Sequence, residues 1–112
     1  MSATNRFNLR DFPLWTALIT PFTHNGDVDY DDLLTLLKAQ EEAGNGIVLL
    51  GSTGEALNLD LATKQAIIEF CCEQNLNVPL MVGVGGTMLQ DTLDWIGWLN
   101  QKPIHALMMV TP

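Results

Sequence analysis

Basic side chains are scarce in this sequence. Its 112 residues include 5 lysines and arginines against 13 aspartates and glutamates, which gives a formal net charge of −8. Nucleic-acid-binding surfaces need clustered lysine and arginine to neutralise phosphates, and the chain has no such cluster. The composition therefore argues against a nucleic-acid partner, and any bound anion must be held by local donors.

Long apolar runs are also missing. No run reaches the roughly 18 residues of a membrane span, and the first ten residues are polar, without the apolar centre of a signal peptide. We therefore expect a cytoplasmic protein with no membrane contact. Its 47% of hydrophobic residues is sufficient for one globular core.

Residues that usually carry catalysis or bind metals are few. Cys71 and Cys72 are adjacent, so they lack the spacing of a metal or redox motif, and we expect reduced, structural thiols. His24 lies in a turn-rich segment and His105 begins the last apolar run, with no partner cysteine, histidine or paired carboxylate near either. The sequence predicts neither a metal nor a cofactor.

Short apolar runs alternate with helical patterns along the chain. Strands are predicted over residues 15–22, 46–51, 79–84 and 104–112, because these runs are rich in β-branched residues and bounded by glycine and proline. Helices are predicted from Asp29 to Gly44, from an N-cap at Asp60, and from a capping box at Thr87 to about Asn100.

Apolar residues at helical spacing identify the faces that should point inward. For Trp95 and Trp98, which flank the third stripe, we favour a place in the core over an interface. The predicted stripes contain Leu33, Leu34, Leu36 and Leu37 in the first helix, Leu61, Ile67, Ile68, Phe70 and Cys71 in the second, and Leu89, Leu93, Ile96 and Leu99 in the third.

The strand–helix alternation predicts an α/β fold made of right-handed parallel βαβ units. Such units build either an open doubly wound sheet or part of a (β/α)8 barrel. In both architectures the active site lies at the carboxyl ends of the strands. Polar residues and glycines gather at those ends, namely Thr20, Ser52 with Thr53, Gly85 with Gly86, and Thr111.

The segment "GSTGE" at residues 51–55 combines two glycines with two hydroxyls after a buried strand. Glycines let the backbone approach a ligand closely, and Ser52 and Thr53 add hydrogen-bond donors. This combination suits a carboxylate or phosphate oxygen. The segment "GVGGTM" does not indicate a dinucleotide site, because Met88 stands where the fingerprint needs its third glycine.

Four motifs in order, "ALITPF", "GSTGE", "MVGVGG" and "MMVTP", resemble the first half of the dihydrodipicolinate synthase and N-acetylneuraminate lyase superfamily. The resemblance implies a (β/α)8 barrel and a pyruvate-dependent class I aldolase. Among its members, the synthase that condenses pyruvate with aspartate semialdehyde in lysine biosynthesis is the better match. N-acetylneuraminate lyase, or another pyruvate aldolase of the superfamily, is the alternative.

The resemblance also implies roles for the hydroxyl residues. Thr53, with backbone N–H groups of its loop, would hold the pyruvate carboxylate, and Ser52 would pass a hydrogen bond into a proton relay with a tyrosine. We also assign Thr20, at the end of the first strand, to substrate binding. Ser52 matches the serine usual in the lyases, whereas the synthases more often have threonine.

Two groups that this chemistry needs have no counterpart in the chain. In the family the relay tyrosine and the Schiff-base lysine follow the segment that ends here at Pro112. In this chain Tyr30 belongs to the first predicted helix, and the lysines (Lys38, Lys64 and Lys102) lie on or beside predicted helices. We therefore expect residues 15–112 to be the first half of a barrel after an N-terminal extension, residues 1–14. The chain alone would be inactive and would need the C-terminal half, and the complete enzyme would be a homotetramer.

The competing hypothesis is a flavodoxin-like domain that binds a small anion at Ser52 and Thr53 without catalysis.

Overall fold

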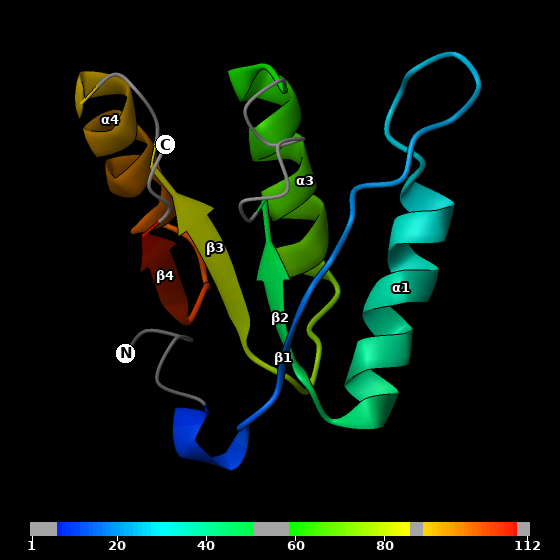
Figure 1. Ribbon diagram of the computed structural model, residues 1–112. Coiled ribbons are helices and arrows are strands. Elements are labelled where there is room, and N and C mark those ends of the chain that lie inside the picture. The colour runs from blue at the N-terminus through cyan, green and yellow to red at the C-terminus, as the bar shows by residue number, and fades with distance from the viewer. Residues whose placement is uncertain (1–6, 51–58, 86–88, 110–112) are drawn as a thin grey trace.

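A computed structural model describes residues 7–50, 59–85 and 89–109 as a parallel sheet covered by helices (Figure 1). A short 3-10 helix, η2 (Leu9–Asp11), precedes the sheet. The strands are β1 (Trp15–Ala17), β2 (Gly46–Leu49), β3 (Leu80–Val84) and β4 (Ala106–Met109), and the helices are α1 (Tyr30–Ala43), α3 (Leu61–Glu73) and α4 (Leu89–Leu99). In the described part, none of the helices has the length and apolar character needed to cross a bilayer.

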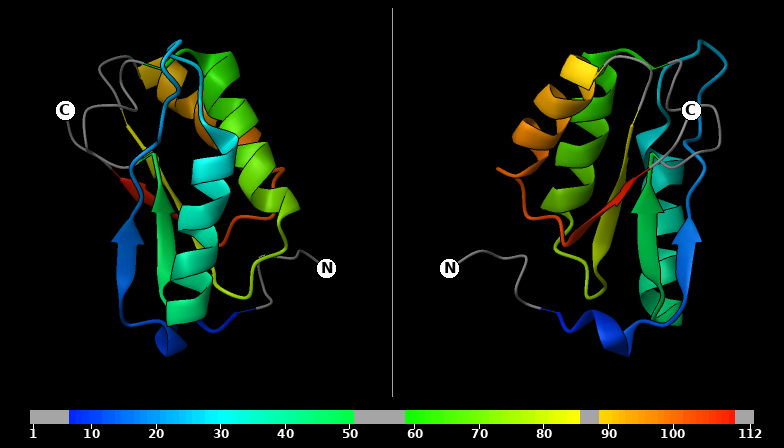
Figure 2. Two further views of the ribbon diagram at one scale, coloured as in Figure 1. Left: turned by 90° about the vertical axis from the view of Figure 1, so that its right-hand side faces the viewer. Right: turned by 60° about the vertical axis from the view of Figure 1, so that its left-hand side comes forward.

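The strands are ordered β1-β2-β3-β4, and every neighbouring pair is parallel. The helices α1, α3 and α4 lie on one face of the sheet (Figures 1 and 2). A flavodoxin-like sheet changes direction at a switch point and carries helices on both faces, whereas a (β/α)8 barrel adds each strand beside the previous one and keeps its helices outside. The described sheet therefore has the order of a barrel segment, and the flavodoxin-like alternative is wrong.

The helix starts and stops follow local capping chemistry. Asp29 and Asp60 are the N-caps of α1 and α3, and the Asp60 carboxylate accepts a hydrogen bond from the Thr63 N–H at 2.8 Å. Gly44 ends α1 with φ of 76°, a left-handed conformation that glycine adopts at low cost. These predicted boundaries are confirmed, and the capping box at Thr87 lies outside the described residues.

The first strand is shorter than the predicted run of residues 15–22. The paired residues of β1 end at Ala17, and the Leu18 N–H still donates to the Val48 carbonyl at 3.0 Å. Pro21 has no N–H to donate, and Phe22 instead pairs with Val28 in an isolated antiparallel bridge. The segment after Leu18 therefore belongs to a loop that leads into α1.

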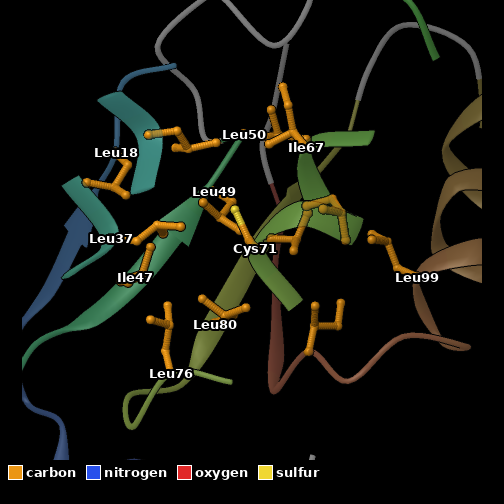
Figure 3. Packing of buried hydrophobic residues seen from close by; sticks show 14 of the residues in the cluster. Leu18, Leu37, Ile47, Leu49, Leu50, Ile67, Cys71, Leu76, Leu80 and Leu99 are labelled. Atoms are coloured by element: carbon orange, nitrogen blue, oxygen red, sulfur yellow. The ribbon is translucent and has the colours of Figure 1, made fainter. Parts of the chain in front are cut away.

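The hydrophobic core lies between the sheet and its helices (Figure 3). Parallel strands need apolar cover, and the helices supply it with residues at the predicted spacing. Leu33 and Leu37 of α1 and Ile67, Ile68 and Cys71 of α3 are buried, as expected. The cluster consists of Leu18, Leu33, Leu37, Ile47, Leu49, Leu50, Ile67, Ile68, Cys71, Leu76, Val78, Leu80, Val82, Val84, Trp95, Leu99 and Ile104.

The prediction for the inward face of α4 is right for Leu99, which is buried, and for Ile96, which packs against the core, but it is wrong for Leu89 and Leu93. Leu89 and Leu93 are 73% and 51% exposed, whereas Trp95 and Leu99 are buried. Positions 95 and 99 form one row along the helix and positions 89 and 93 another, so both rows cannot face the sheet. Burial of the large indole of Trp95 removes more apolar area from water than burial of a leucine side chain does. This difference decides how α4 is rotated about its axis. Leu61, also predicted to point inward, is exposed and lines a cleft between α3 and α4.

The two tryptophans of α4 link it to α3. Their rings stack with centroids 5.3 Å apart and an angle of 8° between the planes. The Lys64 ammonium lies 5.2 Å from the Trp95 ring, and the Lys102 ammonium lies 4.7 Å from the Trp98 ring and 3.3 Å from the Glu69 carboxylate. Both distances are within the range of cation–π attraction. The interpretation of Trp95 as a core residue is confirmed, and Trp98 packs partly buried against the same cluster.

The side chain of His105 completes the hydrogen bonding between β3 and the segment that leads into β4. Its backbone N–H donates to the Leu80 carbonyl at 2.9 Å, and its Nδ1 accepts from the Leu80 N–H, also at 2.9 Å. The imidazole thus takes the place of a ladder carbonyl. The Phe7 ring packs edge-on against the imidazole, with centroids 4.9 Å apart, so the same side chain also holds the N-terminal segment.

We predict that His105→Leu lowers the free energy of unfolding by about 1–3 kcal/mol, because the Leu80 N–H is left buried without this acceptor. His105→Asn keeps an acceptor oxygen at the position of Nδ1 and should lose clearly less. Urea titration of the three proteins measures the difference. Equal losses for the two variants would contradict the acceptor role of the ring.

Candidate functional site

All four strands run in the same direction, so their carboxyl ends meet at one edge of the sheet (Figure 1). Strand β2 lies between β1 and β3. The chain therefore leaves β2, after Leu50, between the strand that leads to Thr20 and the strand that leads to Gly85. The predicted site residues Ser52 and Thr53, together with Gly86 and Thr111, lie outside the described residues.

Thr20 is buried close to this edge. It is 8% exposed and is the one polar side chain among the buried residues of the described part. Gly85, directly after β3, has φ of 144°, a backbone angle that favours glycine. The structure therefore places two of the predicted strand-end positions on neighbouring sides of β2. The role of Thr20 in substrate binding stays a prediction.

Leu50, the residue at which the chain leaves β2, was missed by the sequence reasoning. It has φ of 54°, which is unusual for a leucine. Hydrophobic periodicity treats this position as one more residue of a buried strand, and leucine carries no signal for a left-handed backbone. Only the structure reveals it.

The three lysines of the chain all lie away from the strand ends. Lys38 belongs to α1 and is 3.5 Å from the Glu41 carboxylate. Lys64 of α3 and Lys102, just after α4, face the tryptophan rings. A Schiff-base lysine needs a buried site that lowers its pKa. The predicted helical placement of the lysines is confirmed, and this chain supplies no such group at the sheet edge.

Tyr30, the chain's single tyrosine, begins α1 and packs against α3. Its ring centroid lies 4.8 Å from that of Phe70. Burial, followed by the charge of a Cys71 thiolate, raises the pKa of Tyr30 above its usual value. The phenol therefore keeps its proton and serves packing between two helices.

Cys71 is buried and Cys72 is half-buried, and both thiols are poor nucleophiles. Burial raises the pKa of Cys71 to about 12 and that of Cys72 to about 11. Both line a cavity of about 50 Å³ together with His105. The described residues contain no group of three or more side chains that would hold a metal ion. The expectation of reduced, structural cysteines agrees with these surroundings.

We predict that neither thiol reacts with a disulfide reagent such as Ellman's reagent in the folded chain at pH 8. A pKa of about 11 leaves about a thousandth of Cys72 as thiolate at that pH, and the Cys71 fraction is smaller still. Two thiols per chain should react once urea unfolds the protein. Fast labelling of the native chain would contradict the burial of these groups.

The comparison with protein families identifies the chain. The model of the dihydrodipicolinate synthetase family matches residues 13–112. This chain belongs to that family. The resemblance carried by "ALITPF", "GSTGE", "MVGVGG" and "MMVTP" is thereby confirmed.

Individual relatives support the same assignment. The chain is 52% identical over 99 residues to a 4-hydroxy-tetrahydrodipicolinate synthase of Chlamydia pneumoniae, in an alignment that covers 88% of this chain and 34% of the relative. The chain thus spans about a third of the length of the curated relatives it matches.

Solved structures extend the comparison to the fold. Dihydrodipicolinate synthase from Aquifex aeolicus matches with a TM-score of 0.80 and 26% identity, over 88% of this chain and 34% of that one. N-acetylneuraminate lyase from Mycoplasma synoviae matches with a TM-score of 0.78 and 25% identity, over 94% of this chain and 37% of that one. The four-stranded sheet with its helices corresponds to the N-terminal part of their barrel.

Proposed function

We propose that this chain is the N-terminal part of a 4-hydroxy-tetrahydrodipicolinate synthase. The observation that carries the proposal is the 52% identity over 99 residues to a synthase, joined to a sheet of the matching fold. The reaction is the condensation of pyruvate with aspartate semialdehyde in lysine and diaminopimelate biosynthesis. Residues 15–112 form the first half of the barrel, and residues 1–14 precede it as an extension. The start of β1 at Trp15 supports this division.

The proposed site divides its work between this chain and a later part of a longer protein. A lysine amine from that later part adds to the ketone carbon of pyruvate, and loss of water leaves an imine. Removal of a methyl proton gives an enamine, which attacks the aldehyde carbon of the second substrate. This chain contributes the carboxylate-binding hydroxyl of Thr53, the relay hydroxyl of Ser52, and Thr20 beside them.

Two features support that placement. The buried Thr20 and the left-handed-region Gly85 flank the strand from which the Ser52–Thr53 segment departs. A carboxylate held by hydroxyl and backbone N–H donors in a water-poor site is bound by charge-assisted hydrogen bonds, which are about twice as strong as neutral ones. The chain's formal charge of −8 is consistent with an anion held by such local donors.

N-acetylneuraminate lyase activity is the second candidate. Ser52 and the similarity to the Mycoplasma synoviae lyase favour it. The two solved structures, one of a synthase and one of a lyase, are about equally similar at 26% and 25% identity, and we favour the synthase because of the 52% identity to the Chlamydia pneumoniae protein. A homotetrameric assembly and a cytoplasmic location belong to the same proposal and rest on the family resemblance and the composition.

We predict that the 112-residue chain forms no adduct with pyruvate that borohydride can trap. Lys38, Lys64 and Lys102 lie on or beside helices, and none lies at a strand end. Mass spectrometry after reduction with pyruvate present is the measurement. A protein of the relatives' full length that begins with this chain should gain the mass of one reduced pyruvate on one lysine. Stoichiometric trapping on the short chain would overturn the division of the site.

A second prediction concerns Thr53 in that longer protein. Thr53→Val replaces the hydroxyl with a methyl group of similar shape and should weaken pyruvate binding by about 1.5–3 kcal/mol, the usual value of a hydrogen bond to a charged group. Ser52→Thr keeps the hydroxyl and serves as the matched control, with near-normal kinetics. Steady-state rates with each substrate varied in turn make the test. An unchanged KM for pyruvate in Thr53→Val would refute the assigned role.

A further inference from the structure

Residues 7–14 run along the amino ends of the strands, at the end of the sheet opposite the candidate site. Figures 1 and 2 show η2, which belongs to this segment, below the starts of the strands. At one end of the segment the Leu14 carbonyl accepts a hydrogen bond from the Gly46 N–H at 3.0 Å, where β2 begins. At the other end the Phe7 ring packs against the His105 imidazole, just before β4. We call residues 7–14 the N-terminal strap.

Aromatic rings attach the free end of the strap to the sheet. The Phe7 ring lies 4.9 Å from the His105 ring and 5.6 Å from the Phe12 ring, centroid to centroid, and Phe12 packs partly buried against the core cluster. The hydrogen bonds of η2, from the Asp11 N–H to the Asn8 carbonyl and from the Phe12 N–H to the Leu9 carbonyl, are local. They shape the strap, whereas the His105 ring holds its end against the sheet.

The hydrogen bond of the His105 ring requires a neutral imidazole. Nδ1 accepts from the Leu80 N–H at 2.9 Å, and it can accept only while it carries no proton. An imidazolium has N–H donors at both ring nitrogens, so protonation of Nδ1 would set two donors against each other. Leu80 is 4% exposed, and a buried N–H without an acceptor is costly. Protonation must therefore move the ring away from Leu80.

The charged groups near His105 largely cancel one another. Lys102, which follows α4, lines a cavity together with His105, and its positive charge disfavours an imidazolium. The Lys102 ammonium is itself paired with the Glu69 carboxylate of α3 at 3.3 Å. Glu73, the next acid along α3, is exposed, so water and salt screen its charge. These groups do not provide a strong electrostatic reason for His105 to take up a proton.

The remaining groups around the ring are uncharged. Cys71 and Cys72 of α3 line a second cavity with His105, and their pKa values of about 12 and 11 keep both thiols protonated. From β3 and from the strap, Leu80 and Phe7 face the ring with apolar side chains. The acceptor geometry at Nδ1 therefore decides which form of the imidazole fits.

We propose that His105 is a pH-sensitive switch for the attachment of the N-terminal strap. The neutral ring accepts from the Leu80 N–H and holds Phe7, so the strap is docked. The protonated ring leaves this position, and the strap loses its contact beside β4. An unperturbed histidine titrates near about pH 6.5, so docking is complete above that value and weakens as the pH falls below it. The inference does not depend on the proposed function, because it concerns the opposite end of the sheet.

Amide hydrogen exchange of the 112-residue chain tests this switch. The protection factors of the Leu80 N–H and of the Phe12 N–H in the strap should be about fivefold to tenfold lower at pH 5.5 than at pH 7.5. About tenfold is the limit at pH 5.5 for one histidine that is neutral in the docked state. Both pH values lie above the usual titration range of carboxylates. Equal protection of either amide at the two pH values would overturn the proposal.

Two histidine variants separate this switch from other titrating groups. His105→Asn keeps an acceptor for the Leu80 N–H but does not titrate, so its protection factors should be the same at both pH values. His24→Asn removes the chain's other histidine and should keep the native pH effect. A pH effect that persists in His105→Asn, or that disappears in His24→Asn, would assign the titration to another group and overturn the proposal.

A variant of the strap tests the link through Phe7. Phe7→Leu lacks the aromatic contact with the imidazole, so the Phe12 N–H should be about threefold or more less protected at pH 7.5, with little further loss at pH 5.5. The Leu80 N–H should still lose about fivefold to tenfold of its protection at pH 5.5. Native strap protection with the native pH effect in Phe7→Leu would show that the switch does not act through Phe7, and would refute the proposal.

Discussion

The parallel pairing of β1 to β4 in sequence order is the constraint on which the rest of the structure depends. It sends every strand end to one edge, so loops far apart in the sequence begin close together. It also requires a crossover helix between successive strands, and these helices cover one face (Figure 2). The edge that carries the candidate site and the core on the helix side are therefore two consequences of the same topology.

Much of this architecture was predictable because its signals are local. Asp29, Gly44 and Asp60 act within one helical turn of their own position, and capping depends on little else. The four strands were found from short apolar runs between glycine and proline. The motifs "GSTGE" and "MVGVGG" then decided between architectures that periodicity alone left open, and the observed strand order agrees with them.

The predictions from the sequence were wrong or incomplete where contacts between residues far apart in the chain decide which side chain is buried or where a strand ends. A helical stripe does not reveal that Trp95 displaces Leu93 from the core, since that choice depends on what α3 and the sheet present to α4. The length of β1 depends on its partner strand, and the backbone conformation of Leu50 depends on contacts that its side chain makes in the core cluster. The roles of Ser52 and Thr53 stay predictions from their chemistry and the family resemblance, whereas a leucine with positive φ carries no signal in the sequence.

The same topology explains why a carboxylate-binding segment and a Schiff-base lysine can be far apart in the sequence. At the edge of a barrel each strand contributes a few residues to a common site, so one strand can hold the carboxylate while another supplies the amine. The Schiff-base lysine and the carboxylate-binding segment require opposite surroundings. The lysine must be buried to lower its pKa, whereas the segment after β2 must keep donors free for an anion. At that position the sequence offers hydroxyls and glycine N–H groups rather than a cation, which is the donor set that the predicted anion-binding role of "GSTGE" requires.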